Sequence, residues 1–322
     1  MQFQGQGKPP VGIVFDADIG STIDDALALA MLFGFQGKNE SRVLSVSTTR
    51  SSLNAAIFAD VLVRFYTGEP GPFGGAMPIG LCLSGKMAAP TPMLDAVAGN
   101  AKYPRGILKM NDTADPVALI RNALSAQFDQ NAIVVLTGPA TNLAGLLALP
   151  GTPALIAQKA RTLVVAADAL TMSDIPGARR LFAEWPTPIV VAGGELGDDF
   201  PFPGFPFPGA GIEKDFAWSE AHPLVAAYRA YRPMPYDAPA LAMAAALYAV
   251  RPQENYFKLS DPGVVTVADD GRVRLAPAPS GKHRTLIADP AQKERIQQIY
   301  AETASTRPVG RAQRFRPPQK KQ

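Results

Sequence analysis

Short apolar, β-branched runs alternate with longer helix-forming runs along most of the chain. VGIVF, residues 11–15, predicts a buried strand, and DDALALAMLFGF, residues 24–35, predicts a buried helix because it is almost continuously apolar. A second strand and helix follow at 42–49 and 52–66. Such a β-α-β-α opening predicts an α/β fold with an open, mostly parallel, Rossmann-like sheet and helices on both faces. The pattern then continues with a strand, Gly-Pro turn and helix at 132–149, a strand at 162–167, a helix at 174–185 and a strand at 187–194.

The second half of the chain has a different pattern. Residues 198–211, DDFPFPGFPFPGAG, predict a long loop, because proline can continue neither a helix nor a central strand. Residues 222–250 are helical in pattern, with a break at RPMPYDAP. The segment from Tyr256 to Ala278 predicts a hairpin that turns at 269–271 and either adds antiparallel to the sheet edge or covers its rim.

The length of 322 residues fits one large α/β domain, which we place at 1–306. The last sixteen residues, 307–322, contain four Arg and two Lys and no acidic residue. Without this charge of +6, the net charge of +3 becomes about −3 for residues 1–306. A basic, Pro-rich end of this kind is typical of a disordered, solvated tail. We therefore expect no nucleic-acid or membrane partner.

Composition also limits the class of protein. No apolar run reaches the ~18–20 residues that span a bilayer, so we expect a soluble protein. No signal peptide is visible, which makes a cytoplasmic location the default, although an exported chain whose signal has been removed fits equally. One cysteine, Cys82, and two histidines, His222 and His283, exclude a Cys-based zinc site and a His-rich metal centre.

Four carboxylates lie within ten residues, Asp16 to Asp25, with no basic residue among them. They follow the first predicted strand, and open α/β sheets bind ligands beyond the carboxyl ends of their strands. Asp16 and Asp18 share a side of an extended chain, Gly20 permits a sharp turn, and Asp24 and Asp25 open the next helix. The acids could merely stabilise the helix start and decorate an exposed loop. Clustered between apolar flanks, they more readily indicate a cation, and oxygen ligands without His or Cys favour Ca²⁺ or Mg²⁺.

Five segments together resemble the inosine–uridine-preferring nucleoside hydrolase family, in particular a branch with an extended Asp-Ile-Gly loop. The resemblance covers roughly residues 11–290 and implies a nucleoside-hydrolase-like fold. The two specific segments are FDADIGSTIDDALALAML and YDAPALAMAAALYAVRP, and neither suffices alone. The other three are STTRSSLNAA, VVLTGPATNLAGLL and WPTPIVVAGGELG.

The family hydrolyses the N-glycosidic bond of ribonucleosides with a bound Ca²⁺ that holds the ribose hydroxyls and the attacking water. The resemblance therefore implies an N-ribosyl hydrolase that uses Ca²⁺, takes a small ribonucleoside or ribose-like substrate and forms a homodimer or homotetramer. It also implies residue roles: Asp18 as metal ligand and general base; Asp25, Asp237 and the Thr137 carbonyl as further metal ligands; Asp24 and Asn54 as ribose contacts; and Asp16 as support behind the ligands.

The chain departs from the family pattern in two places. The segment 168–182 lacks the usual Glu-x-Asn element that grips ribose. Asp168 and Asp174 are the candidates to substitute for it, although Asp174 fits better as a helix N-cap. Tyr236 stands where many members have a His that protonates the leaving base, and a tyrosine can contact the substrate and donate a proton there. These departures support an alternative, a catalytically impaired, metal-dependent protein that binds ribose or another polyol. A third interpretation takes FDADIG as the Asp-x-Asp of haloacid-dehalogenase-like phosphotransferases, with Asp16 as nucleophile.

Overall fold

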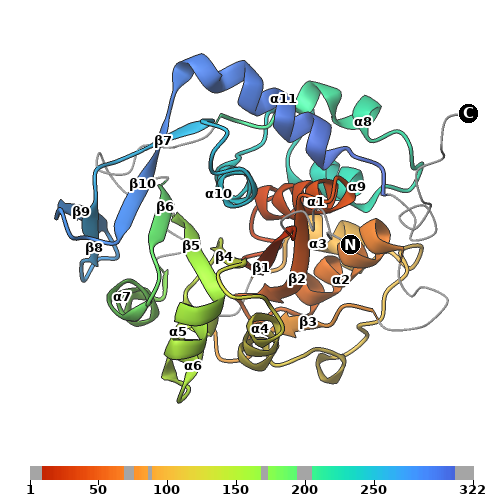
Figure 1. Cartoon of the computed structure of the whole chain (residues 1–322). Helices are drawn as coiled ribbons and strands as arrows, with labels where there is room; N and C mark the ends of the chain where they lie inside the picture. Colours follow the sequence, from red (N-terminus) through yellow and green to blue (C-terminus); the bar gives the residue numbers. More distant parts are fainter. Residues whose placement is uncertain (1–8, 69–75, 86–88, 168–172, 194–204, 309–322) are drawn as a thin grey trace, which may run out of the picture.

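The computed structural model describes residues 9–68, 76–85, 89–167, 173–193 and 205–308. Within these residues ten strands form one sheet of order β3-β2-β1-β4-β5-β6-β10-β8-β9, and β7 pairs with the end of β10 (Figure 1). The strands from β3 to β10 in this order run parallel, whereas β7, β8 and β9 are antiparallel. The strands are β1 (Val11–Ala17), β2 (Ser41–Thr48), β3 (Ile79–Leu81), β4 (Ala132–Leu136), β5 (Ala160–Ala167), β6 (Ile189–Gly193), β7 (Phe257–Leu259), β8 (Gly263–Val267), β9 (Val273–Pro277) and β10 (His283–Ala288).

Helices cover both faces of the sheet, as the sequence predicts. Ile13 and Phe15 of β1 pack on one face with α1, α2, α10 and α11, and Val14, which points the other way, packs with α4, α5, α6 and α7 (Figure 1). The helices are α1 (Asp24–Gly37), α2 (Leu53–Thr67), α3 (Pro92–Ala98), α4 (Pro116–Ser125), α5 (Thr141–Ala148), α6 (Thr152–Lys159), α7 (Ile175–Glu184), α8 (Ile212–Asp215), α9 (Pro223–Tyr231), α10 (Leu241–Val250) and α11 (Lys293–Ala304).

The predicted elements are confirmed, but several others were missed. The hairpin is β8 and β9, with Gly271 at a positive φ in its turn. It joins β10, a strand that the sequence did not predict, and β10 in turn pairs parallel with β6. Helices α3, α4, α6 and α11 were also missed. Half of the predicted loop 198–211, residues 198–204, and nearly all of the tail 307–322 lie outside the described residues. In the described half, 205–211, the chain forms one isolated bridge at Phe207 and a single 3-10 turn at Gly209–Gly211.

Helix α1 is buried almost from end to end between the sheet and the helices α10 and α11. Close packing on α11 depends on Gly34, because a methyl group there would collide with the carbonyl oxygen of Thr303. We therefore expect Gly34→Ala to lower the free energy of unfolding by about 1–3 kcal/mol, the usual cost of overpacking. Gly37→Ala on the same helix is the matched control, because its nearest neighbour would be 4.0 Å away, and we expect a change below about 1 kcal/mol. Urea unfolding of both variants measures the difference, and equal effects would contradict the predicted clash.

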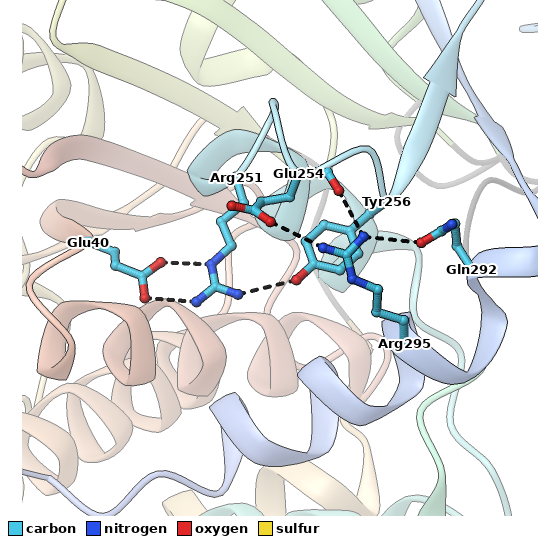
Figure 2. Close-up of polar contacts among 6 residues, drawn as sticks. All are labelled: Glu40, Arg251, Glu254, Tyr256, Gln292 and Arg295. Atoms are coloured by element: carbon cyan, nitrogen blue, oxygen red, sulfur yellow. Dashed lines mark hydrogen bonds and ion pairs between the residues drawn. The ribbon is translucent and has the colours of Figure 1, made fainter.

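A network of hydrogen bonds and ion pairs connects α10 and α11 to the edge of the sheet at which the parallel strands begin (Figure 2). Arg251, just after α10, donates hydrogen bonds of 2.7 and 2.8 Å to the two carboxylate oxygens of Glu40, which directly precedes β2. Arg295 of α11 lies 4.3 Å over the ring of Tyr256 and binds the side chain of Glu254 at 3.1 Å. These contacts fix the end of the sheet that faces away from the carboxylate cluster.

None of the helices in the described ranges is both long and apolar enough to cross a membrane.

Candidate functional site

The carboxylate cluster lies at the carboxyl end of β1, in the middle of the sheet. β2 and β3 extend the sheet on one side of β1, and β4, β5 and β6 extend it on the other. The chain order therefore reverses between β1 and β4, which is where open α/β sheets form ligand crevices. The Thr137 amide, just after β4, donates to the Asp16 carbonyl at 3.0 Å and so ties the two strand ends together.

Three of the four acids line one small cavity of about 20 Å³. This volume suits one water molecule or ion, so a sugar would have to bind at the cavity mouth. Asp18, Asp24 and Asp25 are 3, 5 and 4% exposed, which excludes the interpretation of exposed loop acids. Gly20 has a φ of +104°, as expected for a sharp turn. The lining residues are Asp18, Ser21, Thr22, Asp24, Asp25, Thr137, Ala166, Leu241 and Ala242.

Asp16 lies behind the cavity and is completely buried. One of its carboxylate oxygens accepts hydrogen bonds from Ser47 at 2.6 Å and from Asn142 at 2.8 Å. Burial raises the pKa of Asp16 to about 6, although these two hydrogen bonds act to lower it. A carboxylate enclosed in this way cannot reach a phosphate group, which argues against a phosphotransferase with Asp16 as nucleophile.

Asp18 has a cationic partner that the sequence did not reveal. Nε of Arg50 lies 2.9 Å from Oδ1 and 3.0 Å from Oδ2 of Asp18. Arg50 follows β2, which is the parallel neighbour of β1, so both side chains emerge at the same edge of the sheet. The Asp18 oxygens that would accept a proton or bind a metal therefore already contact a guanidinium group.

Asp24 and Asp25 point to different partners from the first turn of α1. Asp24 accepts hydrogen bonds from the backbone amides of Ala242 at 2.6 Å and Met243 at 3.2 Å, at the start of α10. Asp25 accepts a hydrogen bond from the Thr137 hydroxyl. Asp24 therefore anchors the N-terminus of α10, while the contact between Asp25 and Thr137 joins the start of α1 to the carboxyl end of β4.

Three other residues of the predicted site do not line the cavity. Asp237 is exposed and accepts a hydrogen bond from the Gly209 amide at 2.9 Å, and Asn54 is exposed in the first turn of α2. The Tyr236 hydroxyl donates to the Tyr228 carbonyl at 2.6 Å, and the two tyrosine rings stack with centroids 4.4 Å apart. Burial raises the pKa of Tyr236 above its usual value, which makes its proton harder to release. Their substrate and metal roles stay predictions.

The donor set fits Ca²⁺ in chemistry. Asp18, Asp25 and Thr137 offer only oxygen atoms, which this cation prefers, around a space of the size of one ion. Within the described ranges, however, no three Asp, Glu, His or Cys side chains are gathered closely enough to hold a metal as they stand. The oxygen-rich lining is therefore of the chemical type that Ca²⁺ prefers, while the four ligands that the resemblance implies do not all line the cavity.

The residues that sequence reasoning missed around the carboxylates lie inside segments it had already singled out. Ser47 and Arg50 belong to STTRSSLNAA, and Asn142 belongs to VVLTGPATNLAGLL. A polar residue at or just after a parallel strand that neighbours β1 is the pattern that could have found Arg50 and Ser47. Asp174 was placed correctly, because it is the N-cap of α7 and accepts from the Gly177 amide at 3.0 Å. Asp168 lies outside the described residues.

Neither histidine lines the cavity. His222 instead makes the stability of the fold depend on pH. It begins α9, as expected, but it is 3% exposed, and in the described part of the chain neither ring nitrogen has a hydrogen-bond partner. Burial lowers its pKa to about 3. The aromatic rings around it belong to Phe65, Tyr66, Phe216 and Trp218.

We expect burial of His222 to make the folded chain less stable in acid. The unfolded chain takes up a proton at His222 near pH 6.5, whereas the folded chain does so only near pH 3, so stability falls as the pH drops from about 6.5 towards 3. Between pH 7 and 5 this costs about 2 kcal/mol. Urea unfolding at the two pH values measures it, and His222→Phe should remove that part of the difference. An unchanged pH dependence in His222→Phe would contradict the prediction.

Comparisons with known proteins agree with this geometry at the level of the fold. No protein-family model matches the sequence, and no curated protein matches it significantly. Among solved structures, a plant nucleoside hydrolase is similar with a TM-score of 0.65 and 19% identity over 92% of this chain and 100% of that one. The inosine-uridine preferring nucleoside hydrolase of Bacillus anthracis has a TM-score of 0.63 and 15% identity over 92% and 99% of the two chains. The purine-preferring ribonucleoside hydrolase of Gardnerella vaginalis has a TM-score of 0.65 and 15% identity over 91% and 98%. At these identities the similarity shows one thing: this chain has the fold of the nucleoside hydrolases.

Proposed function

We propose that this chain hydrolyses the N-glycosidic bond of a ribonucleoside or a related N-riboside, giving ribose and the free base. The observation that carries the proposal is the convergence of Asp18, Asp24, Asp25 and Thr137 on one buried cavity. That cavity lies at the switch point of a sheet whose fold is shared with nucleoside hydrolases. Its chemistry suits a reaction in which positive charge develops on a sugar ring, because nearby carboxylates stabilise that charge.

The chain's own residues supply the steps of this proposal. The oxygen of the attacking water bonds to the anomeric carbon as the C–N bond breaks, and Asp18 takes a proton from this water. The base leaves with the electron pair of the broken bond and takes up a proton from solvent, and the carboxylates around the cavity favour the cationic sugar. Asp18, Asp25 and Thr137 would hold a Ca²⁺, with Asp237 as the fourth ligand that the resemblance implies. When bound, the ion would acidify its water and bind sugar hydroxyls. Asp24, which accepts hydrogen bonds from the Ala242 and Met243 amides, would be the ribose contact that the resemblance implies.

The experiment is direct. Purified full-length chain is incubated with inosine, adenosine, guanosine, uridine and cytidine, with added Ca²⁺ or after treatment with a chelator, and free ribose is measured by a reducing-sugar assay. We expect ribose from at least one nucleoside and a large loss of it after chelation. Absence of ribose from the whole panel with Ca²⁺ present would count against the hydrolase, and chelator-resistant turnover would count against calcium. Light scattering on the same preparation tests the expected homodimer or homotetramer.

A second candidate is a protein that binds ribose or another polyol at this cavity without cleaving it. The contact between Arg50 and Asp18 favours it, because the guanidinium occupies the oxygens that a general base would use. The commitment of the Tyr236 hydroxyl to the Tyr228 carbonyl also favours it, because no described leaving-group acid then faces the cavity. Calorimetric binding of ribose in Ca²⁺, together with no ribose release from the nucleoside panel, would select this function.

A further inference from the structure

Arg50 and Asp18 form an ion pair in a largely water-free part of the site. The two side chains are 13% and 3% exposed. At such burial a charge pair interacts much more strongly than at the surface, and removing one partner leaves a costly buried charge. Asp18 therefore has a counter-ion supplied by the chain itself.

The geometry of this pair is incomplete. Nε of Arg50 makes the contact with the carboxylate, at 2.9 and 3.0 Å from its two oxygens. Nη2 of Arg50 is buried and has no hydrogen-bond partner among the described residues. A bidentate contact, with two parallel N–H groups, would be the stronger arrangement. The guanidinium therefore binds Asp18 through Nε while Nη2 contributes no hydrogen bond, so another cation could displace it from the carboxylate.

A metal ion and Arg50 would need the same atoms. Ca²⁺ binds carboxylate oxygens at about 2.3–2.6 Å, and both Asp18 oxygens already contact Nε. Two cations on one carboxylate would also lie within a few Å of each other and repel strongly in a buried site. Thr137 is distant from Asp18 and Asp25 in sequence, but all three residues line the same space of about 20 Å³. An ion held by Asp25 and Thr137 would therefore lie close to Asp18.

We propose that Arg50 is a built-in competitor of the divalent cation at Asp18, so that cation binding must displace the guanidinium. This inference rests on the cation site of the proposed function and adds its regulation. The site then has two states, one neutralised by Arg50 and one by the ion, and the affinity for the ion includes the work of removing Arg50 from Asp18. Arg50 is a positioning residue here, because it acts through Asp18.

The test is Ca²⁺ binding, measured by calorimetry on the full chain without substrate. We expect Arg50→Gln to bind Ca²⁺ at least about tenfold more tightly than the wild-type chain, within the usual range of coupling between two binding events. Ca²⁺ should also raise the melting temperature of Arg50→Gln more than that of the wild type, because the ion replaces a lost counter-ion. Arg50→Lys retains the charge and is the second variant, expected to stay close to the wild type.

The chain offers a matched control in Arg64→Gln. Arg64 pairs with Asp60 at 2.7 Å, with side chains 14% and 3% exposed, so the pair closely resembles Arg50–Asp18 in burial but lies within α2 and outside the cavity lining. We expect its Ca²⁺ affinity to equal that of the wild type. A gain in Arg64→Gln as large as that in Arg50→Gln would overturn the inference, because the effect would then be general destabilisation.

The remaining outcomes separate the inference from the proposed function. Equal and tight Ca²⁺ binding by wild type and Arg50→Gln would overturn competition and leave the cation site standing. Weaker binding by Arg50→Gln would overturn it as well, because Arg50 would then assist the ion. No binding by either chain would remove the inference and the calcium part of the proposal together, while ribose release by the wild type decides independently whether hydrolysis occurs.

Discussion

Asp18→Asn is expected to lower the rate of ribose release by roughly 10²–10⁴-fold, the usual contribution of a general base. An amide cannot take a proton from water, although its oxygen can still accept a hydrogen bond from Nε of Arg50. The substitution keeps the shape of a side chain that is 3% exposed, so the cavity lining is retained. Ribose release is followed at saturating nucleoside and Ca²⁺, so that the loss is measured in kcat.

The control for this variant must exclude a folding defect. Asp18→Asn leaves Arg50 buried without a carboxylate, so the double variant Asp18→Asn/Arg50→Gln removes that charge and should be as inactive as the single variant. Asp129→Asn changes a surface acid that pairs with Lys159 and should keep full activity. A loss of less than about threefold in Asp18→Asn would contradict the role of Asp18 in catalysis.

Asp24→Ala is expected to lower the free energy of unfolding by about 2–4 kcal/mol. Asp24 is 5% exposed and accepts from the Ala242 and Met243 amides, which begin a helix that is itself buried. Removing the carboxylate leaves two buried amides without this acceptor, and each unsatisfied group costs about 1–3 kcal/mol. Urea unfolding of the wild type and the variant at pH 7 provides the measurement.

A comparison with Asp24→Asn separates the hydrogen bonds from the charge. Both substitutions remove the same negative charge from the carboxylate cluster, but asparagine retains one acceptor oxygen. We expect Asp24→Ala to be less stable than Asp24→Asn by about 1–2 kcal/mol. If the two variants unfold at the same urea concentration, the anchoring of α10 by Asp24 is wrong and relief of repulsion among the acids dominates.

Much of the fold could be predicted because its central strands and helices are nearly continuous apolar runs. β1 and α1 are buried almost completely, so their apolar residues in the sequence correspond directly to positions in the core. The missed elements are shorter or more polar. β3 has only three residues, and α4 and α11 each bury about one face. β10 begins with the polar residues His283 and Arg284, so its sequence does not resemble that of a strand that pairs on both sides.

The candidate site could be predicted in part for a similar reason. Asp18, Asp24 and Asp25 are close in sequence, and a single strand–loop–helix unit brings them together. Thr137 joins them because β4 is the parallel neighbour of β1. Arg50 was missed because its partner is 32 residues away and the pairing depends on which strands are adjacent. Asp237 and Asn54 were assigned by resemblance, and their positions depend on loop geometry that no local pattern specifies.

A crystal structure of the full chain, grown with Ca²⁺ and D-ribose, is the most direct measurement of the cation and sugar site. The expected result is one Ca²⁺ in the cavity at about 2.3–2.6 Å from oxygens of Asp18, Asp25 and Thr137, with ribose at the cavity mouth and the Arg50 guanidinium moved off Asp18. The contradicting result is a cavity that holds no ion at saturating Ca²⁺, with Arg50 still on Asp18 and ribose bound elsewhere or not at all.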